Sequence, residues 1–314
     1  MKAFKDLKIL VIGDILLDKY IEGTVTRISP EAPILILDKT HTWYRLGGAG
    51  NVSTNTAALG VYTFQIGRVG PDKEGKIIHT ELDKHKINSM GVLCDVTIPT
   101  TLKTRFVCQH TQLLRVDEED RKSIEHTELA YSIEEYLDTE IQKYDAIIIS
   151  DYNKGVIYPG LISKILQLCK KHGIISIVDT HNPNLDIFKG YTCITPNKHE
   201  LEKVIKTKLT RITDIGDAAY ALRKQLNLEY LLVTLSDQGM LLVTHDKTEH
   251  IPISQTNVLD VTGCGDTAIA VFTVMLASGY SALDSARWAN KAAGVVCGKM
   301  GTATITSEEL FTAD

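Results

Sequence analysis

Five nearly continuous apolar runs, each followed by a small or polar residue, set the strongest limit on what this chain can fold into. They are KILVIG (8–13), AIIIS (146–150), IISIVD (174–179), CIT (193–195) and YLLVTL (230–235). Such runs are typical of strands that are buried on both faces of a parallel sheet. Segments of helical length lie between strand-like runs, at 49–59, 72–86, 125–142, 159–172, 197–205 and 213–227. The alternation predicts an α/β fold with a central, mainly parallel sheet and helices on both faces.

Two stretches break this alternation. Residues 20–46 and 91–117 contain short strand-like pieces without a helical period, and together they predict a small β-sheet that projects as a lid. Residues 239–253 predict a hairpin at the edge of the main sheet. Because no proline-rich linker, repeat or shift in composition divides the chain, we expect residues 1–314 to form a single domain.

Composition excludes several classes of function. A net charge of −5 gives no preference for nucleic acid or a membrane surface. No apolar run reaches the roughly 18 residues that span a bilayer, and the N-terminus lacks a signal-peptide layout. The six cysteines are scattered without a CxxC pair, so we expect reduced thiols in a cytoplasmic protein. The histidines show no zinc-ligand spacing.

The stretch LDVTGCGDT (259–267) is the most informative about function. A β-type run ends at Asp260, a glycine turn follows, and the apolar run AIAVFTVMLA then predicts a helix. A helix N-terminus favours an anion through its free N–H groups and dipole. Asp266 in that turn fits phosphoryl transfer, with the carboxylate taking a proton from the attacking group. A left-handed turn with a capping Asp is an equally good explanation of the spacing alone.

A second glycine motif, LGGAGNVSTNTAALG, spans residues 46–60. Gly47 and Gly48 would let a ligand approach the backbone, and Asn51 in the first helical turn could contact a polyol. A tight turn with small-residue packing explains the motif as well, and taken alone is favoured. Ser53 breaks the GxGxxG pattern, so a dinucleotide site is unsupported, and no Walker A motif is present.

Polar residues follow each of the five runs, where ligands bind in parallel sheets, although Asp and Asn at strand ends also serve to cap helices; a binding site is the favoured explanation. They are Asp14 and Asp18, Asp151 to Lys154, Asp179, Asn197 with Glu200, and Ser236. Asn197 and Glu200 lie at positions i and i+3 of a predicted helix, which suits water-mediated Mg²⁺, although a capping box is the favoured explanation of the motif taken alone. The small-residue helix at 288–302 could make room for adenine beside Asn290, or could simply pack closely.

Together, GGAGNV and DVTGCGDT resemble the motifs of the ribokinase-like (PfkB) carbohydrate kinases, and the similarity covers essentially the whole chain. The second motif is highly specific, although the family usually has Ala at Cys264. Further segments resemble the kinase part of the bacterial heptose-phosphate enzymes: RISPEAPI (27–34), LKTRFVCQHTQLLRVDEED (102–120), SDYNKGV (150–156), TPNKHE (195–200), TLSDQGM (234–240) and GKMGTATIT (298–306). Those enzymes phosphorylate D-glycero-β-D-manno-heptose 7-phosphate at O1, for lipopolysaccharide cores.

The resemblance implies ATP, Mg²⁺ and a monovalent cation such as K⁺ as cofactors, and a role for each motif residue. Asp266 would be the base, and the N–H groups of Gly263, Cys264 and Gly265 would stabilise the transferred phosphoryl group. The implied sugar-binding residues are Asp14, Gly47, Gly48, Asn51 and Asp179. Asn197 and Glu200 would organise Mg²⁺, with Glu200 acting through water, while Ser236, Gly239 and Asn290 would line the nucleotide site. The lid would also form a homodimer contact.

One departure concerns the sugar phosphate. Heptose kinases commonly read Asp-Pro-Lys where this chain has Asp179-Thr180-His181, and His181 is a weaker, pH-dependent substitute for the lysine. Lys154, Arg105 and Arg115 remain candidate phosphate partners. The sequence stops at Asp314 without an HxGH-type motif, which implies a stand-alone kinase and a separate nucleotidyltransferase. A kinase for another sugar or a nucleoside, or a non-catalytic sensor on the same fold, remain alternatives.

Overall fold

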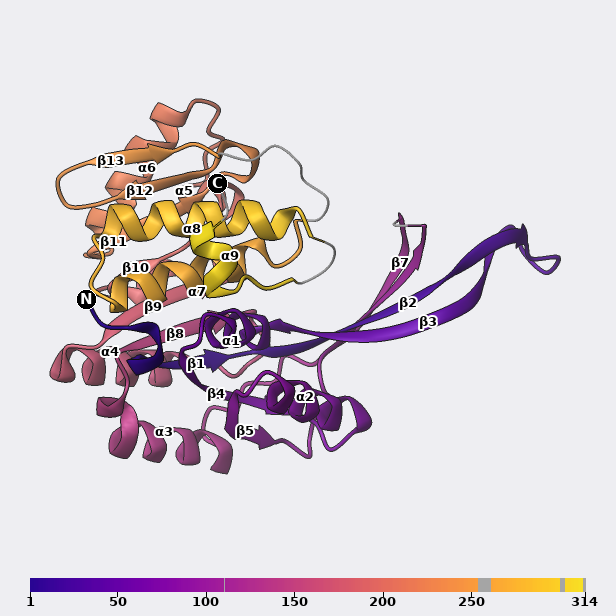
Figure 1. Ribbon diagram of the computed structural model, residues 1–314. Helices are drawn as coiled ribbons and strands as arrows, with labels where there is room; N and C mark the ends of the chain where they lie inside the picture. Colours follow the sequence, from indigo (N-terminus) through magenta and orange to yellow (C-terminus); the bar gives the residue numbers. More distant parts are fainter. Residues whose placement is uncertain (110, 254–260, 300–302, 313–314) are drawn as a thin grey trace.

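The computed structural model describes residues 1–109, 111–253, 261–299 and 303–312. A nine-stranded sheet forms its centre, in the order β13-β12-β11-β10-β9-β8-β1-β4-β5 (Figure 1). The strands are β1 (Lys8–Gly13), β4 (Tyr62–Val69), β5 (Asn88–Cys94), β8 (Ala146–Asp151), β9 (Ile175–Thr180), β10 (Cys193–Ile194), β11 (Tyr230–Thr234), β12 (Met240–Val243) and β13 (Thr248–Ile251). From β11 to β5 every pair is parallel, and the β12–β13 hairpin adds antiparallel strands at one edge. The predicted mainly parallel sheet is therefore confirmed.

Helices cover both faces of this sheet. One face carries α1 (Ala49–Ala58), α2 (Lys73–Lys84), α7 (Cys264–Ala277), α8 (Ala282–Cys297) and α9 (Ser307–Thr312). The other carries α3 (Glu128–Glu140), α4 (Pro159–His172), α5 (Lys198–Ile205) and α6 (Ile212–Gln225). Side chains of β1 alternate between the two cores, with Ile9 and Val11 in one and Leu10 and Ile12 in the other, as the two-residue period of a strand requires.

A four-stranded sheet in the order β3-β2-β6-β7 projects from this body as the predicted lid (Figure 1). It consists of β2 (Ile15–Ile28), β3 (Leu35–Gly48), β6 (Leu102–Cys108) and β7 (Thr111–Glu118). The lid boundary that the sequence predicted is partly wrong, because residues 91–94 belong to β5 and pair in parallel with β4. Val92 is 6% exposed and packs in the main core, which is why this piece belongs to the main sheet.

The expectation that all six cysteines are reduced is wrong for one pair. Cys264 begins α7 and Cys297 ends α8, and a disulfide joins them with their Cα atoms 6.1 Å apart. The two helices pack antiparallel, so residues 33 positions apart in the sequence meet at the same end. Cys94, Cys108, Cys169 and Cys193 are free thiols. Among the described residues, no helix combines the length and apolar character that crossing a membrane requires.

Candidate active site

A cavity lies at the carboxyl ends of the central strands, against the N-terminus of α7. Its lining comes from the loop after β8, the end of β9 with the loop that follows it, the segment from β10 into α5, the strand β11, and the start of α7 with the turn before it. The lining residues are Tyr152, Asp179, His181, Thr195, Asn197, Glu200, Leu232, Thr234, Gly263, Gly265, Asp266, Ala268 and Ile269. The structure therefore brings together five residues that the sequence singled out for phosphoryl transfer or metal binding, together with Asp179.

Asp266, the predicted base, lies in the first turn of α7 and is 5% exposed. The turn before it depends on Gly263, whose φ of 81° is in the left-handed region that favours glycine. One carboxylate oxygen of Asp266 accepts a hydrogen bond from Asn51 Nδ2 at 2.7 Å, and the other accepts from the Tyr152 hydroxyl at 2.9 Å. Burial raises the pKa of Asp266 to about 6, and the two donors act against that rise. Near neutral pH the carboxylate is thus ionised, fixed and able to accept a proton.

Tyr152 is a site residue whose role the sequence did not reveal. Its hydroxyl reaches Asp266, while its ring meets the ring of His181 edge-on at a centroid distance of 4.7 Å. Burial and the neighbouring carboxylates hold the pKa of the Tyr152 hydroxyl far above its usual value, so this group stays protonated and donates. The only sequence signal was its position in the polar stretch after β8.

Asp14 holds the loop that follows β8 through hydrogen bonds to its backbone. It is 2% exposed, and its carboxylate accepts hydrogen bonds from the backbone N–H groups of Tyr152, Lys154 and Val156, at 3.0, 2.9 and 3.1 Å. Burial raises its pKa to about 6, and these three donors act against that rise. Instead of presenting a free carboxylate to the cavity, Asp14 anchors the loop that carries Tyr152 and Lys154.

The glycine pair at the end of β3 meets the acidic residues at the start of β2. A Cβ at Gly48 would lie 2.4 Å from the Asp14 carbonyl oxygen, and Gly48 has a φ of 56°. A Cβ at Gly47 would lie 3.0 Å from Asp18 Oδ2. Asp18 is 3% exposed and forms an ion pair with the guanidinium of Arg105 on β6. Arg105, a candidate phosphate partner, is therefore already paired with a carboxylate of the neighbouring lid strand β2.

Asn197 and Glu200 form a complete capping box at α5. Glu200 N donates to Asn197 Oδ1 and Asn197 N donates to Glu200 Oε2, each at 2.9 Å. The second oxygen of Glu200 lies 2.7 Å from Nδ1 of His181, and this contact raises the pKa of His181. The helix-capping explanation of this motif is therefore present in the structure, and Glu200 also lines the cavity.

Three carboxylates, those of Asp179, Glu200 and Asp266, line the same cavity. Burial and the charges of Asp266 and Glu200 raise the pKa of Asp179 to about 7. A divalent cation would relieve this mutual repulsion, so the residues fit Mg²⁺. Within the described ranges, no three His, Cys, Asp or Glu side chains converge on a common ion position.

The residues predicted to line a nucleotide site lie outside this cavity. Ser236 and Gly239 form the turn between β11 and β12, where Gly239 has a φ of 85° and a Cβ would lie 2.1 Å from the Ile251 carbonyl oxygen. Asn290 of α8 donates from Nδ2 to the Pro252 carbonyl oxygen at 2.9 Å. The structure does not bring these three residues to Asp266, and their role toward a nucleotide stays a prediction.

A second cavity adjoins the first and is rich in cations. It is lined by Lys103, Arg121, Tyr152, Asn153, Lys154 and His181, and shares Tyr152 and His181 with the cavity of Asp266. Lys154 and Arg121 pair with Glu119 at 2.7 and 3.1 Å. The sequence had pointed to Lys154, whereas Lys103 and Arg121 were missed because only the lid geometry brings them here.

Arg115, also named as a phosphate partner, instead pairs with Asp117 on β7 at 2.9 Å and does not line the second cavity. Its side chain is about half exposed.

Comparison with known proteins places these features in context. Residues 6–309 match the family model described as pfkB family carbohydrate kinase. The chain is 38% identical over 303 residues to the bifunctional protein HldE of Helicobacter pylori (strain G27), covering 96% of this chain and 65% of that protein. It is 37% identical over 311 residues to HldE of Desulfatibacillum aliphaticivorans, covering 99% of this chain and 63% of that protein. The chain thus spans slightly less than two thirds of these relatives.

Solved structures share the fold at low identity. Arabidopsis thaliana ribokinase complexed with ribose and ATP superimposes with a TM-score of 0.79 at 20% identity, over 97% of both chains. Phosphofructokinase-2 from Escherichia coli in complex with potassium gives a TM-score of 0.78 at 18% identity, again over 97% of both chains. These similarities confirm the predicted ribokinase-like fold.

Proposed function

The chain belongs to the pfkB family of carbohydrate kinases, and we propose that it phosphorylates D-glycero-β-D-manno-heptose 7-phosphate at O1, with ATP as donor. The family supports the reaction type. The relatives named HldE, together with the segments that resemble heptose-phosphate enzymes, support the heptose acceptor.

In the proposed reaction Asp266 accepts the proton of the O1 hydroxyl as that oxygen bonds to the γ-phosphorus. The bond between this phosphorus and the β–γ bridging oxygen breaks, and ADP leaves. The N–H groups of Gly263, Cys264 and Gly265 at the start of α7 are proposed to stabilise the charge on the transferred group. Asn51 and Tyr152 hold the carboxylate of Asp266, so little reorganisation is needed during proton transfer.

Mg²⁺, when bound, would neutralise phosphate charge during transfer. Glu200 and Asp179 would hold it through water, next to the capped N-terminus of α5.

The observation that carries the acceptor assignment is the cationic cavity next to Asp266. Lys103, Arg121 and Lys154 supply three positive charges, against the carboxylates of Glu119 and Asp117 with which they pair. A sugar whose hydroxyl lies at Asp266 could therefore place a phosphate among these cations. A neutral sugar or nucleoside would leave this charge unused.

The test is an ADP-release assay over heptose 7-phosphate, fructose 6-phosphate, ribose, fructose and adenosine, with the phosphorylated position assigned by ³¹P NMR. We expect the highest kcat/KM for heptose 7-phosphate and a product phosphorylated at O1. Preference for an unphosphorylated sugar would refute the acceptor assignment, and the absence of sugar-dependent ADP release would refute the kinase function.

We further propose that the lid forms a homodimer contact. Its strands expose large apolar side chains, namely Ile28, Leu35, Leu113, Leu114 and Val116. Such a concentration of exposed apolar residues marks an interaction surface. Light scattering during size-exclusion chromatography should give twice the mass of the chain, and a monomer at micromolar concentration would contradict this assignment.

A further inference from the structure

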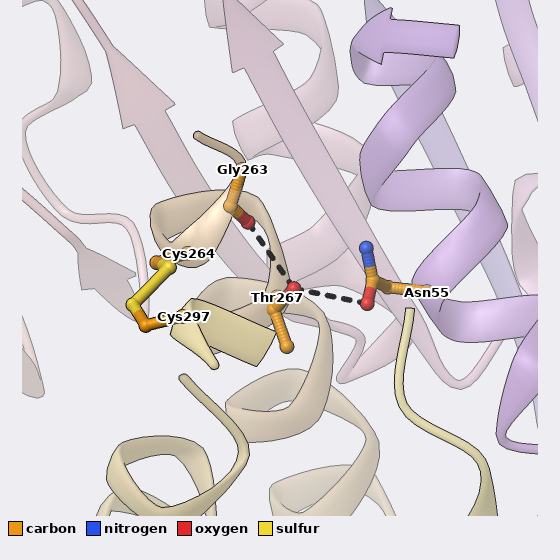
Figure 2. The surroundings of a disulfide bond; sticks show 5 residues. All are labelled: Asn55, Gly263, Cys264, Thr267 and Cys297. Atoms are coloured by element: carbon orange, nitrogen blue, oxygen red, sulfur yellow. Dashed lines mark hydrogen bonds between the residues drawn. A yellow bond between two sulfur atoms is a disulfide. The ribbon is translucent and has the colours of Figure 1, made fainter. Parts of the chain in front are cut away.

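The disulfide lies within the turn that is proposed to perform phosphoryl transfer. Cys264 is flanked by Gly263 and Gly265 and lies two residues before Asp266 (Figure 2). Cys297 is the last residue of α8, so the bond ties the start of α7 to the end of its neighbouring helix. Neither sulfur belongs to a residue that lines the cavity, and the bond therefore leaves the cavity open.

The same turn is held on its opposite side by polar contacts. The Thr267 hydroxyl lies 3.0 Å from Asn55 Oδ1 and 3.1 Å from the Gly263 carbonyl oxygen, as Figure 2 shows. Thr267 N also donates to the Gly263 carbonyl oxygen at 3.0 Å. Asn55 belongs to α1, so the turn is fastened to α1 by hydrogen bonds and to α8 by a covalent bond. Only the second of these attachments can be opened by a change in redox conditions.

We propose that Cys264 and Cys297 form a reversible thiol–disulfide modification site, in which the disulfide holds the catalytic turn in its working geometry and reduction releases it. The disulfide form is assigned as the active one because, in it, Asp266 accepts hydrogen bonds from both Asn51 and Tyr152. Backbone N–H groups stabilise a transition state only when they are already positioned, so a looser turn should transfer phosphoryl groups more slowly.

The chemistry is an exchange with a small-molecule disulfide. The thiolate of Cys264 attacks one sulfur of that disulfide and releases one small thiol. The thiol of Cys297 then attacks the mixed disulfide, which closes the protein bond and releases a second small thiol. The two protons leave on the released thiols, and a dithiol reductant reverses both steps. Both cysteines are partly exposed, whereas Cys169 and Cys193 are buried.

The experiment compares the full chain after treatment with oxidised glutathione or dithiothreitol, with the thiol state read by peptide mass spectrometry. We expect oxidised protein to contain the Cys264–Cys297 bond and to turn over about tenfold faster than reduced protein. Hydrogen–deuterium exchange of residues 261–268 should speed up on reduction. Cys297→Ser should show the lower rate and no response to reductant, while Cys94→Ser, which alters a free thiol of β5, should respond like the wild type.

Two results would overturn the proposal. One is the failure of the two cysteines to pair under oxidant, and the other is equal turnover and equal exchange in verified oxidised and reduced protein. The activity readout rests on the proposed kinase function, but the pairing and exchange readouts do not. Loss of sugar-dependent ADP release in every state would therefore refute the function, while the mass and exchange data would still decide on the redox site.

Discussion

Replacing Tyr152 by Phe should shift the pH dependence of catalysis while leaving the fold intact. The change removes one hydroxyl that donates to Asp266 at 2.9 Å and keeps the ring that packs against His181. The backbone N–H of residue 152 still donates to Asp14. The carboxylate of Asp266 then keeps the hydrogen bond from Asn51.

The size of the shift follows from the lost hydrogen bond. A hydrogen bond to a charged group contributes about 1.5–3 kcal/mol, and one pKa unit corresponds to roughly 1.4 kcal/mol. Since water can partly replace the hydroxyl, we expect the pKa of Asp266 to rise by about one unit. Burial raises the pKa of Asp266 to about 6 in the wild type. The hydrogen bonds from Asn51 and Tyr152 and the charge of His181 lower this pKa, and the charge of Asp18 raises it. Because the base must be ionised, activity is lost as the pH falls.

The assay is kcat/KM for ADP release between pH 5.5 and 9. We expect Tyr152→Phe to lose about fivefold at pH 6 and little above pH 8, because its acidic limb moves to higher pH. Tyr158→Phe is the matched control, since its hydroxyl also donates to a carboxylate, Glu134, at 2.6 Å, but neither residue lines the cavity of Asp266 or the cationic cavity beside it. An acidic limb in Tyr152→Phe that coincides with the wild type would refute this reasoning.

Four further changes test other parts of the structure. Asp266→Asn should retain ATP binding by calorimetry and lose about three decades of turnover, and a near-normal rate would exclude it as the base. Lys154→Ala should raise KM for heptose 7-phosphate about tenfold with KM for ATP unchanged, so equal effects on both would argue against a phosphate contact. Gly48→Ala should unfold at clearly lower urea than Gly60→Ala, because both have positive φ but only Gly48 would clash, and matching midpoints would contradict this. Cys297→Ser should lower the free energy of unfolding by at most about 3–4 kcal/mol relative to the oxidised wild type, because it opens a loop of 33 residues. Urea unfolding should show no difference between this variant and the reduced wild type, and a variant as stable as the oxidised wild type would contradict the expectation.

The sequence predicted the strands whose side chains are apolar on both faces, but not β4. That strand carries the polar residues Thr63, Gln65 and Arg68, which obscure its pattern. Each is buried with a partner from elsewhere in the chain, such as Thr56 for Thr63 and Asp95 for Arg68. A single sequence does not reveal which polar side chains will find such partners, so this strand was not predicted.

The residues of the candidate site also differ in how far the sequence predicted them. Asp266 and the glycine turn were predicted because their chemistry is contained in consecutive residues. Arg121 was missed and the role of Tyr152 was not predicted, because both depend on how a loop and the lid meet the sheet. The pairing of Cys264 with Cys297 was missed for the same reason, since it follows from the antiparallel packing of α7 and α8.

The lid ribbon of β2 and β3 begins next to the residues that hold Asp266, because β3 leads into α1 and α1 carries Asn51, a donor to Asp266. No linker separates it from the body: β2 starts two residues after β1 ends, and β3 runs directly into α1. The ribbon of β2 and β3 extends roughly 45 Å from the Ile15–Gly48 pair to its tip at the Ile28–Leu35 pair. Register shifts at Glu22/Gly23 and Val25/Arg27 concentrate bending in the outer half. We therefore expect displacements near the tip to be absorbed by bending there, and displacements of the inner half to be transmitted to Asp18 and Gly47.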